Sequence, residues 1–113
     1  MDCIFCKIIN GEIPSAKVYE DEYVYAFNDI SPCAPVHVLF IPKKHIQSVS
    51  HIESGDEVYV SAIFSAIKKV AQELNLGDGY RVVTNTGDAA GQTVKHLHFH
   101  LIGGRSLQWP PGW

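Results

Sequence analysis

The sequence predicts an α+β domain in which an antiparallel sheet of about five strands is accompanied by one long helix and a short N-terminal helix. Short apolar runs separated by turn residues predict the strands, and one longer stretch has helical spacing. Strands joined mainly by hairpins, with the helices set apart from them, are typical of the α+β class. Because 113 residues that are 46% hydrophobic have room for one core, we expect a single domain over residues 1–113, with residues 103–113 as a C-terminal tail.

The first half of the chain is expected to contain three strands. A short helical segment precedes a turn at residues 11–14. Two strands, at residues 17–20 and 22–27, then flank a turn at Glu20 and Asp21. Pro32 and Pro35 interrupt the chain before a third, β-rich run at residues 36–41.

One long helix is expected after residue 53. Ser54 and Glu57 have the spacing of a capping box, and Gly77 follows the end of the apolar periodicity. The buried face is predicted from residues spaced three or four apart, namely Val60, Ile63, Phe64, Ile67, Val70, Ala71 and Leu74. A further strand at residues 80–84 follows this helix.

The last expected strand contains three histidines, His96, His98 and His100, that alternate with apolar residues. Successive strand residues point to opposite faces, so the histidines share one face while the apolar residues face the core. The first and third histidines would lie roughly 13 Å apart along a strand. They could not both bind one metal through bonds of about 2 Å. We therefore expect the three rings to have different roles.

A polar, turn-rich loop at residues 85–93 leads into the histidine segment. Such a loop can turn successive backbone N–H groups toward one point and so form a concavity for an anion. Gly91 allows close backbone approach, while Gln92 and Thr93 add side-chain donors. Alone, the segment reads as an ordinary hairpin loop. Beside three imidazoles it favours a phosphate site.

The charge balance argues against partners that need a basic surface. Nine Lys and Arg against twelve Asp and Glu give a net charge of −3, which argues against nucleic acid and anionic membranes as partners. The apolar runs are too short to span a bilayer, and Asp2 and Lys7 interrupt the N-terminus, so no signal peptide is apparent. We expect a cytoplasmic protein with reduced thiols, whose phosphate ligand is held by dipoles and imidazoles.

A Cys-x-x-Cys pair, Cys3 and Cys6, is the remaining motif. In a cytosolic protein this spacing indicates a metal pair or a redox pair rather than a structural disulfide. Zinc needs four ligands, and the chain offers three candidates to complete them, His45, His51 and His96. Two buried free thiols are the alternative reading. Cys33, between two prolines, is interpreted as incidental.

Segment 96–102, with the pattern His-φ-His-φ-His-φ-φ, resembles the signature of the histidine triad (HIT) superfamily of nucleotide hydrolases and transferases. Further segments similar to that superfamily occur in the expected order at residues 4–9, 27–32, 34–37, 41–46, 91–93 and 109–112. The terminal Trp-Pro-Pro-Gly is similar to the histidine triad nucleotide-binding branch. Branches that cleave dinucleoside polyphosphates or transfer nucleotides between sugars commonly carry glutamine near or at the position of His100.

The resemblance implies a hydrolase that cleaves the P–N bond of purine nucleoside 5'-phosphoramidates, such as adenosine 5'-monophosphoramidate, through a nucleotidyl-histidine intermediate. We expect His98 to be the nucleophile, with His37 and His96 one layer behind it. The α-phosphate and leaving group are assigned to His100, Asn85, Gln92 and Thr93, with Gly91 in the same loop. The nucleoside is expected against Phe5, Ile8, Phe27 and Ile30, with Asp29 accepting from the ribose hydroxyls. The first three of these could equally be plain core.

The resemblance also implies a cofactor and partners. Some superfamily members hold a structural zinc through residues that correspond to Cys3, Cys6, His45 and His96, although others lack both cysteines and fold without metal. No organic cofactor is expected. The partners are a purine nucleotide (AMP, GMP or a related phosphoramidate) and a second copy of the chain, in a homodimer joined by its sheet edges, where the tail reaches the partner's site. Two alternatives remain: a dinucleoside polyphosphate hydrolase, and a nucleotide-binding adaptor that acts through protein partners.

Overall fold

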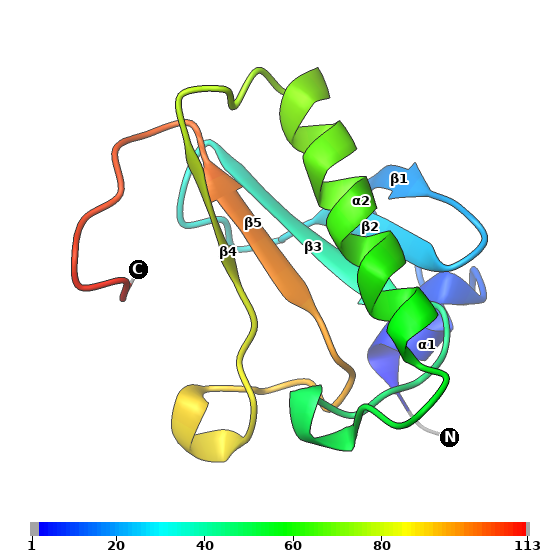
Figure 1. Ribbon diagram of the computed structural model, residues 1–113. Helices are drawn as coiled ribbons and strands as arrows, with labels where there is room; N and C mark the ends of the chain where they lie inside the picture. Colours follow the sequence, from blue (N-terminus) through cyan, green and yellow to red (C-terminus); the bar gives the residue numbers. More distant parts are fainter. Residues whose placement is uncertain (1–2, 113) are drawn as a thin grey trace.

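The computed structural model describes residues 3–112 and contains a five-stranded antiparallel sheet in the order β1-β2-β3-β5-β4 (Figure 1). The elements are α1 (Ile4–Ile9), β1 (Lys17–Glu20), β2 (Val24–Asn28), β3 (Val36–Pro42), η1 (Val49–His51), α2 (Glu57–Glu73), β4 (Tyr80–Val83), η2 (Asp88–Ala90) and β5 (Phe99–Gly103). The predicted fold class is therefore confirmed. Among the described helices, none is long and apolar enough to cross a membrane. Trp113, the last residue of the predicted tail, lies outside the described residues.

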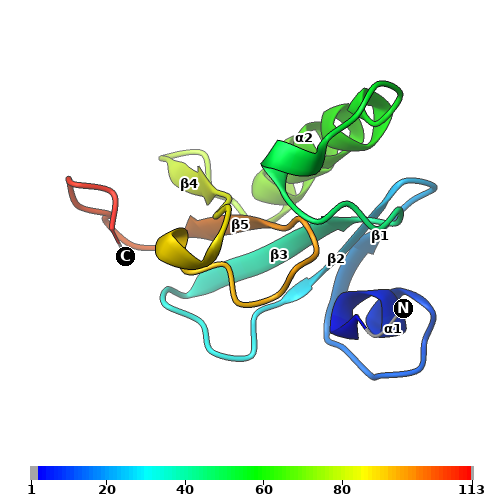
Figure 2. The same cartoon turned by 90° about the horizontal axis from the view of Figure 1, so that it is seen from below.

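The two helices cover opposite faces of the sheet, α2 on one side and α1 on the other (Figure 2). Alternation along β2 and β3 explains this, because Val38 and Phe40 face α2 whereas Leu39 and Ile41 face α1. Leu97, Phe99 and Leu101 pack in the core beneath α2, as predicted. The histidines of the same segment therefore lie on the α1 face of the sheet.

The predicted capping box is wrong. The structure places Asp56, not Ser54, at the N-cap of α2, and no side chain caps the helix there. The buried carboxylate of Asp56 instead accepts hydrogen bonds from the Glu53 N–H and the Lys44 ammonium. These bonds close a turn just before the helix, which begins at Glu57.

The buried face of α2 was predicted correctly at Ile63, Ile67, Val70 and Ala71, with Ala66 in addition. Two predicted members are wrong, because Phe64 and Leu74 are 50% and 40% exposed. Phe64 lies at the border of the buried stripe, where its ring meets only Phe99 edge-on, with 5.4 Å between ring centroids.

The histidine strand is shorter than predicted, because β5 begins only at Phe99. The Leu97 N–H donates to the Ile46 carbonyl oxygen, in the loop before η1, instead of to a neighbouring strand. His96 and His98 therefore lie in the segment that enters the strand, while His100 lies within it, paired with Leu39 of β3.

Candidate active site

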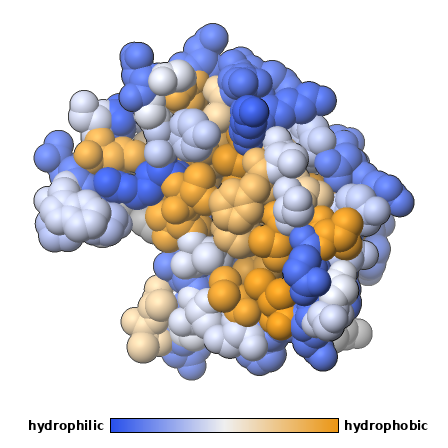
Figure 3. Space-filling view, in the orientation of Figure 1, coloured by the Kyte–Doolittle hydropathy of each residue, from blue (hydrophilic) through white to orange (hydrophobic). Residues whose placement is uncertain are grey.

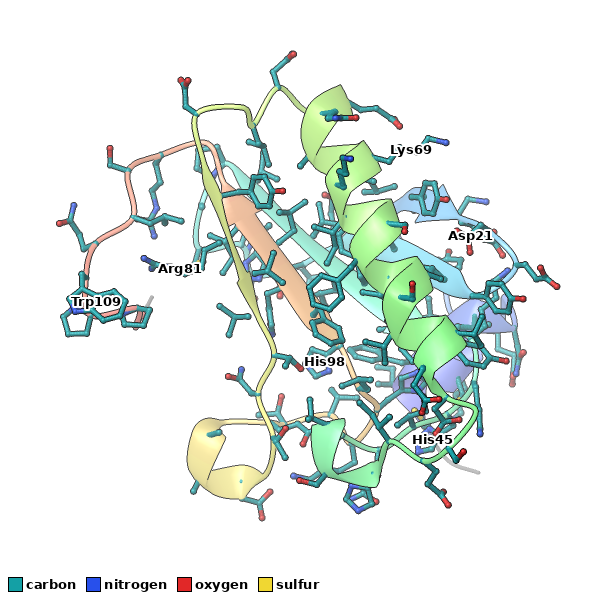
Figure 4. All side chains as sticks on the ribbon, in the orientation of Figure 1. Asp21, His45, Lys69, Arg81, His98 and Trp109 are labelled. Atoms are coloured by element: carbon teal, nitrogen blue, oxygen red, sulfur yellow. The ribbon has the colours of Figure 1, made fainter. Side chains whose placement is uncertain are left out.

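Three buried imidazoles, those of His37, His98 and His100, meet on the α1 face of the sheet. Because β3 and β5 are hydrogen-bonded neighbours, His37 lies beside His100, with ring centroids 5.1 Å apart. The centroids of His98 and His100 are 5.2 Å apart. Figure 4 shows His98 at the lower end of the sheet, near the polar loop that contains η2. The predicted face thus brings the second and third triad histidines together.

The tautomer of His98 is set by a backbone carbonyl. Its Nδ1 lies 2.7 Å from the backbone oxygen of His96, and a carbonyl oxygen can only accept, so Nδ1 carries the proton. The second ring nitrogen, Nε2, is then left with its lone pair. Phe5 packs edge-on against this ring at 5.2 Å between centroids, which restricts its rotation. The Thr84 hydroxyl donates to the backbone oxygen of His98 and joins the segment to the end of β4.

A hydrogen-bonded chain sets the tautomers of His37 and His100. The Cys33 N–H can only donate, and it meets Nδ1 of His37 at 3.2 Å, so the proton of a neutral His37 is on Nε2. That N–H donates to Nδ1 of His100 at 2.9 Å. The Nε2 of a neutral His100 therefore carries a proton and acts as a donor. Asp29 also approaches Nε2 of His37, at 3.4 Å.

Burial keeps these rings neutral. Desolvation lowers the pKa of His98 and of His37 from the ordinary value, against the opposing influence of the Asp29 carboxylate. For His100, burial and the neighbouring His98 and His37 lower the pKa to about 4. At neutral pH the site thus combines an unprotonated ring nitrogen on His98 with a neutral donor on His100. Such a pair can attack an electrophile and donate to the group attached to it.

The loop before the triad is held by Gln92, which is buried. Its side-chain oxygen accepts from the Gly87 N–H, and its side-chain nitrogen donates to the backbone oxygens of Gln47 and Val94. Both amide hydrogens are therefore occupied, and the expectation that this amide donates to phosphate is wrong for this conformation. Gly91, at φ +82°, ends the η2 turn in the left-handed region that favours glycine.

The predicted nucleoside-binding residues fall into two groups. Phe5, Ile8 and Phe27 are buried in a core cluster between α1 and the sheet, which is the plain-core reading of these side chains. Ile30, by contrast, is 97% exposed in the loop after β2. Asp29 lies at the start of that loop, where its carboxylate accepts from the Ser31 N–H and faces His37. Phe5, which packs on His98, and the Asp29 carboxylate, which faces His37, therefore flank the imidazoles.

The four predicted metal ligands, Cys3, Cys6, His45 and His96, converge, with all four ligand atoms within 4.8 Å of one another. Nδ1 of His96 lies 3.2 Å from Nδ1 of His45 and 3.4 Å from Sγ of Cys3. Its other nitrogen, Nε2, donates to the Pro42 carbonyl oxygen and leaves Nδ1 as an acceptor. These separations match the edges of a tetrahedron around a cation with bonds of about 2.0–2.3 Å. His51, a further candidate, instead bonds Ser48.

The donor set fits zinc chemically as well. Without a cation, burial and the neighbouring Cys3 thiol raise the pKa of Cys6 to about 11, so the thiol remains protonated. A bound cation would displace the thiol proton of Cys6 and bind the thiolate. A cavity of about 560 Å³ opens beside the cluster and is lined in part by Cys3, His45 and Thr93. His96 belongs to this cluster and also supplies the carbonyl that orients His98.

A five-stranded antiparallel sheet with alternating histidines on one face, beside a glycine-containing loop, defines the class of histidine triad proteins. The HIT domain family matches residues 10–107, and the chain belongs to this family. An uncharacterized HIT-like protein from Synechococcus elongatus is 50% identical over 98% of this chain and 97% of its own length.

Solved structures show the same fold. A HIT family hydrolase from Legionella pneumophila is 47% identical with a TM-score of 0.95, over 98% of this chain and 100% of that one. A histidine triad nucleotide-binding protein from Candida albicans is 41% identical with a TM-score of 0.83, over 99% of this chain and 85% of that one. At such identities, similarity extends to the sequence as well as to the fold.

A carbonyl acceptor for Nδ1–H of His98 was expected from the sequence and is present, whereas the atoms that set the tautomers of His37 and His96 were missed. The partners of His37 and His96 are the Cys33 N–H and the Pro42 carbonyl, and residue type does not reveal backbone groups. Cys33 was interpreted as incidental, and its thiol has no part in this network. Thr84 was also missed, because its bond to His98 joins segments whose pairing register the sequence does not show.

Proposed function

We propose that this protein hydrolyses the P–N bond of purine nucleoside 5'-phosphoramidates through a nucleotidyl intermediate on His98. The observation that carries the proposal is the pairing of a His98 ring whose Nε2 is unprotonated with a neutral His100 whose Nε2 is a donor. Two similar structures, described as a HIT family hydrolase and a histidine triad nucleotide-binding protein, support the hydrolase class and the nucleotide ligand.

In the first half of the reaction, Nε2 of His98 attacks phosphorus and the P–Nε2 bond forms as the P–N bond to the amine breaks. The departing amine takes up a proton from solvent, while the Nε2–H of His100 donates a hydrogen bond to it. Donors aimed at the phosphoryl oxygens stabilise the charge that develops there, and we assign Thr93 and Asn85 to this task. Gln92 holds their loop in place.

In the second half, water attacks phosphorus and releases a proton to solvent, the P–Nε2 bond breaks, His98 regains its Nε2 lone pair, and nucleoside monophosphate leaves. The carbonyl of His96 stabilises the ring of His98 in both steps, because it accepts a hydrogen bond from the Nδ1–H throughout. The base would lie against Phe5, Ile8 and Phe27, which are only 6%, 8% and 6% exposed, and against the exposed Ile30, while Asp29 accepts from the ribose hydroxyls.

A structural zinc fits the cluster of Cys3, Cys6, His45 and His96, and we assign these four residues as its ligands. Four protein ligands leave no open position, so the metal would join α1 and the loop after β3 to the start of the triad and take no part in the chemistry. The carbonyl of His96, on which His98 depends, would be positioned by this linkage.

The assembly we propose is a homodimer formed through β4 and the adjoining face of α2. Strand β4 is an edge of the sheet with unpaired backbone groups on its outer side. Exposed Phe64 of α2 packs on Phe99 of β5, the strand next to β4, and Figure 3 shows apolar surface gathered on this face of the molecule. A second copy that joined β4 to β4 would cover both features.

The decisive experiment compares turnover of adenosine 5'-monophosphoramidate with turnover of a diadenosine polyphosphate. We expect AMP and ammonia from the first substrate at a rate at least about 100-fold above that of the second. His98→Ala serves as the blank for contaminating hydrolases. Preferential cleavage of the polyphosphate would establish the alternative hydrolase, and nucleotide binding without turnover of either would favour the adaptor.

A further inference from the structure

The C-terminal tail meets the active-site face through Arg105. Its guanidinium donates to the carbonyl oxygen of Cys33 from Nε at 3.2 Å and from Nη2 at 3.0 Å. Cys33 is the same residue whose N–H donates to His37. One residue of the loop after β2 is therefore bound by the tail on one side and by a site histidine on the other.

The loop after β2 runs from Asp29 to Pro35 without strand pairing. Its base is closed by the Asp29 N–H, which donates to the His37 carbonyl oxygen at 2.9 Å, and its beginning by the Ser31 N–H bond to Asp29. Near its end, Gly104 approaches so closely that an added Cβ would lie 2.9 Å from Cβ of Pro35. This close approach brings the neighbouring Arg105 within reach of Cys33.

The consequence for the site follows from the hydrogen-bond directions. While the Cys33 N–H occupies Nδ1 of His37, the His37 proton is on Nε2 and is donated to His100. If Cys33 moved away, Nδ1 of His37 could take the proton and Nε2 would become an acceptor. The proton of His100 would then move to Nδ1, and its Nε2 would no longer donate to the leaving group. The Asp29 carboxylate, 3.4 Å from Nε2 of His37, favours the original tautomer, so the two tautomers of His37 would coexist.

We propose that Arg105 is a positioning residue that holds Cys33 against His37 and thereby keeps His100 in the tautomer that donates to substrate. This role rests on the proposed function for its effect on turnover, but the tautomers themselves can be observed without any substrate. A guanidinium suits this role, because two of its N–H groups donate to the same carbonyl oxygen and so fix both its position and its direction.

The test uses the full-length protein with ¹⁵N-labelled histidines and three variants, Arg105→Ala, Arg105→Lys and Arg81→Ala. Long-range ¹H–¹⁵N spectra report which ring nitrogen carries the proton, and signals are assigned with His37→Gln and His100→Gln. Arg81→Ala is the matched control, because Arg81 anchors the same tail through the backbone oxygen of Gln108, at 2.8 Å, without touching Cys33.

We expect both His37 and His100 to be protonated at Nε2 in the unmodified protein and in Arg81→Ala. Arg105→Ala should show a population of His37 protonated at Nδ1 and a fall in kcat of about threefold to tenfold, with KM changed less than about twofold. Arg105→Lys, which retains one donor group, should fall between the two.

Unchanged tautomers in Arg105→Ala would overturn the proposal, as would equal effects of Arg81→Ala and Arg105→Ala. Altered tautomers with normal kcat would also overturn it, because His100 would then act independently of its tautomer. Should the unmodified protein fail to hydrolyse phosphoramidates at all, the proposed function would be wrong, whereas the spectra would still decide whether Arg105 sets the tautomers.

Discussion

Nδ1 of His98 lies 2.7 Å from the backbone oxygen of His96, so the second triad histidine is oriented by the first. The His96 ring, in turn, faces the cysteine pair and donates from Nε2 to the Pro42 carbonyl oxygen. The position of the proposed nucleophile therefore depends on a residue that belongs to the metal cluster. His96 and His98 thus occupy different positions, although both alternate with apolar residues in one short segment.

His98→Asn should abolish turnover, with kcat lowered by at least about 1000-fold, because no other ring nitrogen in the triad is both unprotonated and directed at substrate. Mass spectrometry of acid-free quenched reactions should show a nucleotidyl group on the unmodified protein and none on the variant. As a control for the fold, the variant should still bind AMP. Turnover near the normal rate would show that another residue is the nucleophile.

The alternating apolar and histidine residues at 96–101 correctly predicted which side chains enter the α2 core and which face the site. This part was predictable because side-chain direction in extended chain follows from sequence spacing alone. The exposure of Phe64 could not be predicted from the sequence, because it depends on how much of the α2 surface the neighbouring strands cover. The periodicity of a helical sequence shows which residues share a face. It does not show how much of that face a neighbouring element covers.

The convergence of the cysteine pair with His45 and His96 was expected from the resemblance, and the structure brings all four together. The role of Gln92 was harder to predict. Its amide is suited both to binding phosphate and to bonding the backbone, and only the folded loop shows that Gly87, Gln47 and Val94 occupy it. Backbone partners of this kind depend on the path of the folded chain, which cannot be predicted from residue types.

Protein purified without added metal should contain about one zinc per chain by elemental analysis. Cys6→Ser should lower the zinc content to well below half and reduce the thermal midpoint, because a tetrahedral site loses one of four ligands. Cys33→Ser is the matched control, because Cys33 lies outside the cluster, and it should retain zinc. Equal zinc content in Cys6→Ser and Cys33→Ser would exclude the assigned ligands.

Asp29→Ala should raise KM for a ribonucleoside phosphoramidate about tenfold, since a hydrogen bond to a charged acceptor contributes roughly 1.5–3 kcal/mol. For the 2'-deoxy analogue the increase should be less than about threefold, because one of the two hydroxyls is absent. The carboxylate also faces His37, so kcat is measured separately for both substrates. If KM rose equally for the two substrates, Asp29 would act on the histidines and would not bind the ribose hydroxyls.

Stability should decrease on acidification. Burial holds the pKa of His100 at about 4 against an ordinary value of 6.5, so between these values the unfolded chain binds a proton that the folded chain does not. The contribution of His100 is therefore fully present above pH 6.5, declines by about 1.4 kcal/mol per pH unit below it, and levels off near pH 4. Urea unfolding at several pH values measures this slope.

His100→Gln removes this ionisation while keeping a polar side chain. Its free energy of unfolding should fall with acid about 1 kcal/mol per pH unit less steeply than that of the unmodified protein. His37, whose pKa is also lowered by burial, contributes in the same direction and remains in both proteins. Parallel slopes for the two proteins would mean that His100 is not kept neutral by the folded structure.

The proposed dimer can be tested by placing a charge on its expected interface. Phe64→Glu places a charge on the exposed apolar face beside β4 and should convert a dimer to a monomer in light scattering at micromolar concentration. Val49→Glu is the control, because Val49 is exposed to a similar extent, 43% against 50%, but lies in η1, outside α2 and β4. A monomer before any substitution would refute the proposed assembly.

Deletion of residues 107–113 should change the preference among amine leaving groups more than the affinity for AMP. Trp109 is 84% exposed and projects away from the sheet, on the side opposite His45 (Figure 4), so it lies far from the metal cluster of its own chain. We expect the exposed end of the tail, from residue 107 onward, to reach the site of the partner subunit. There it would meet the outward-facing leaving group, because the base lies deeper, against Phe5 and Phe27. The ratio of kcat/KM for a bulky and a small amine should therefore shift by about threefold or more. If that ratio were unchanged in a protein that remains dimeric, the tail would have no role in substrate choice.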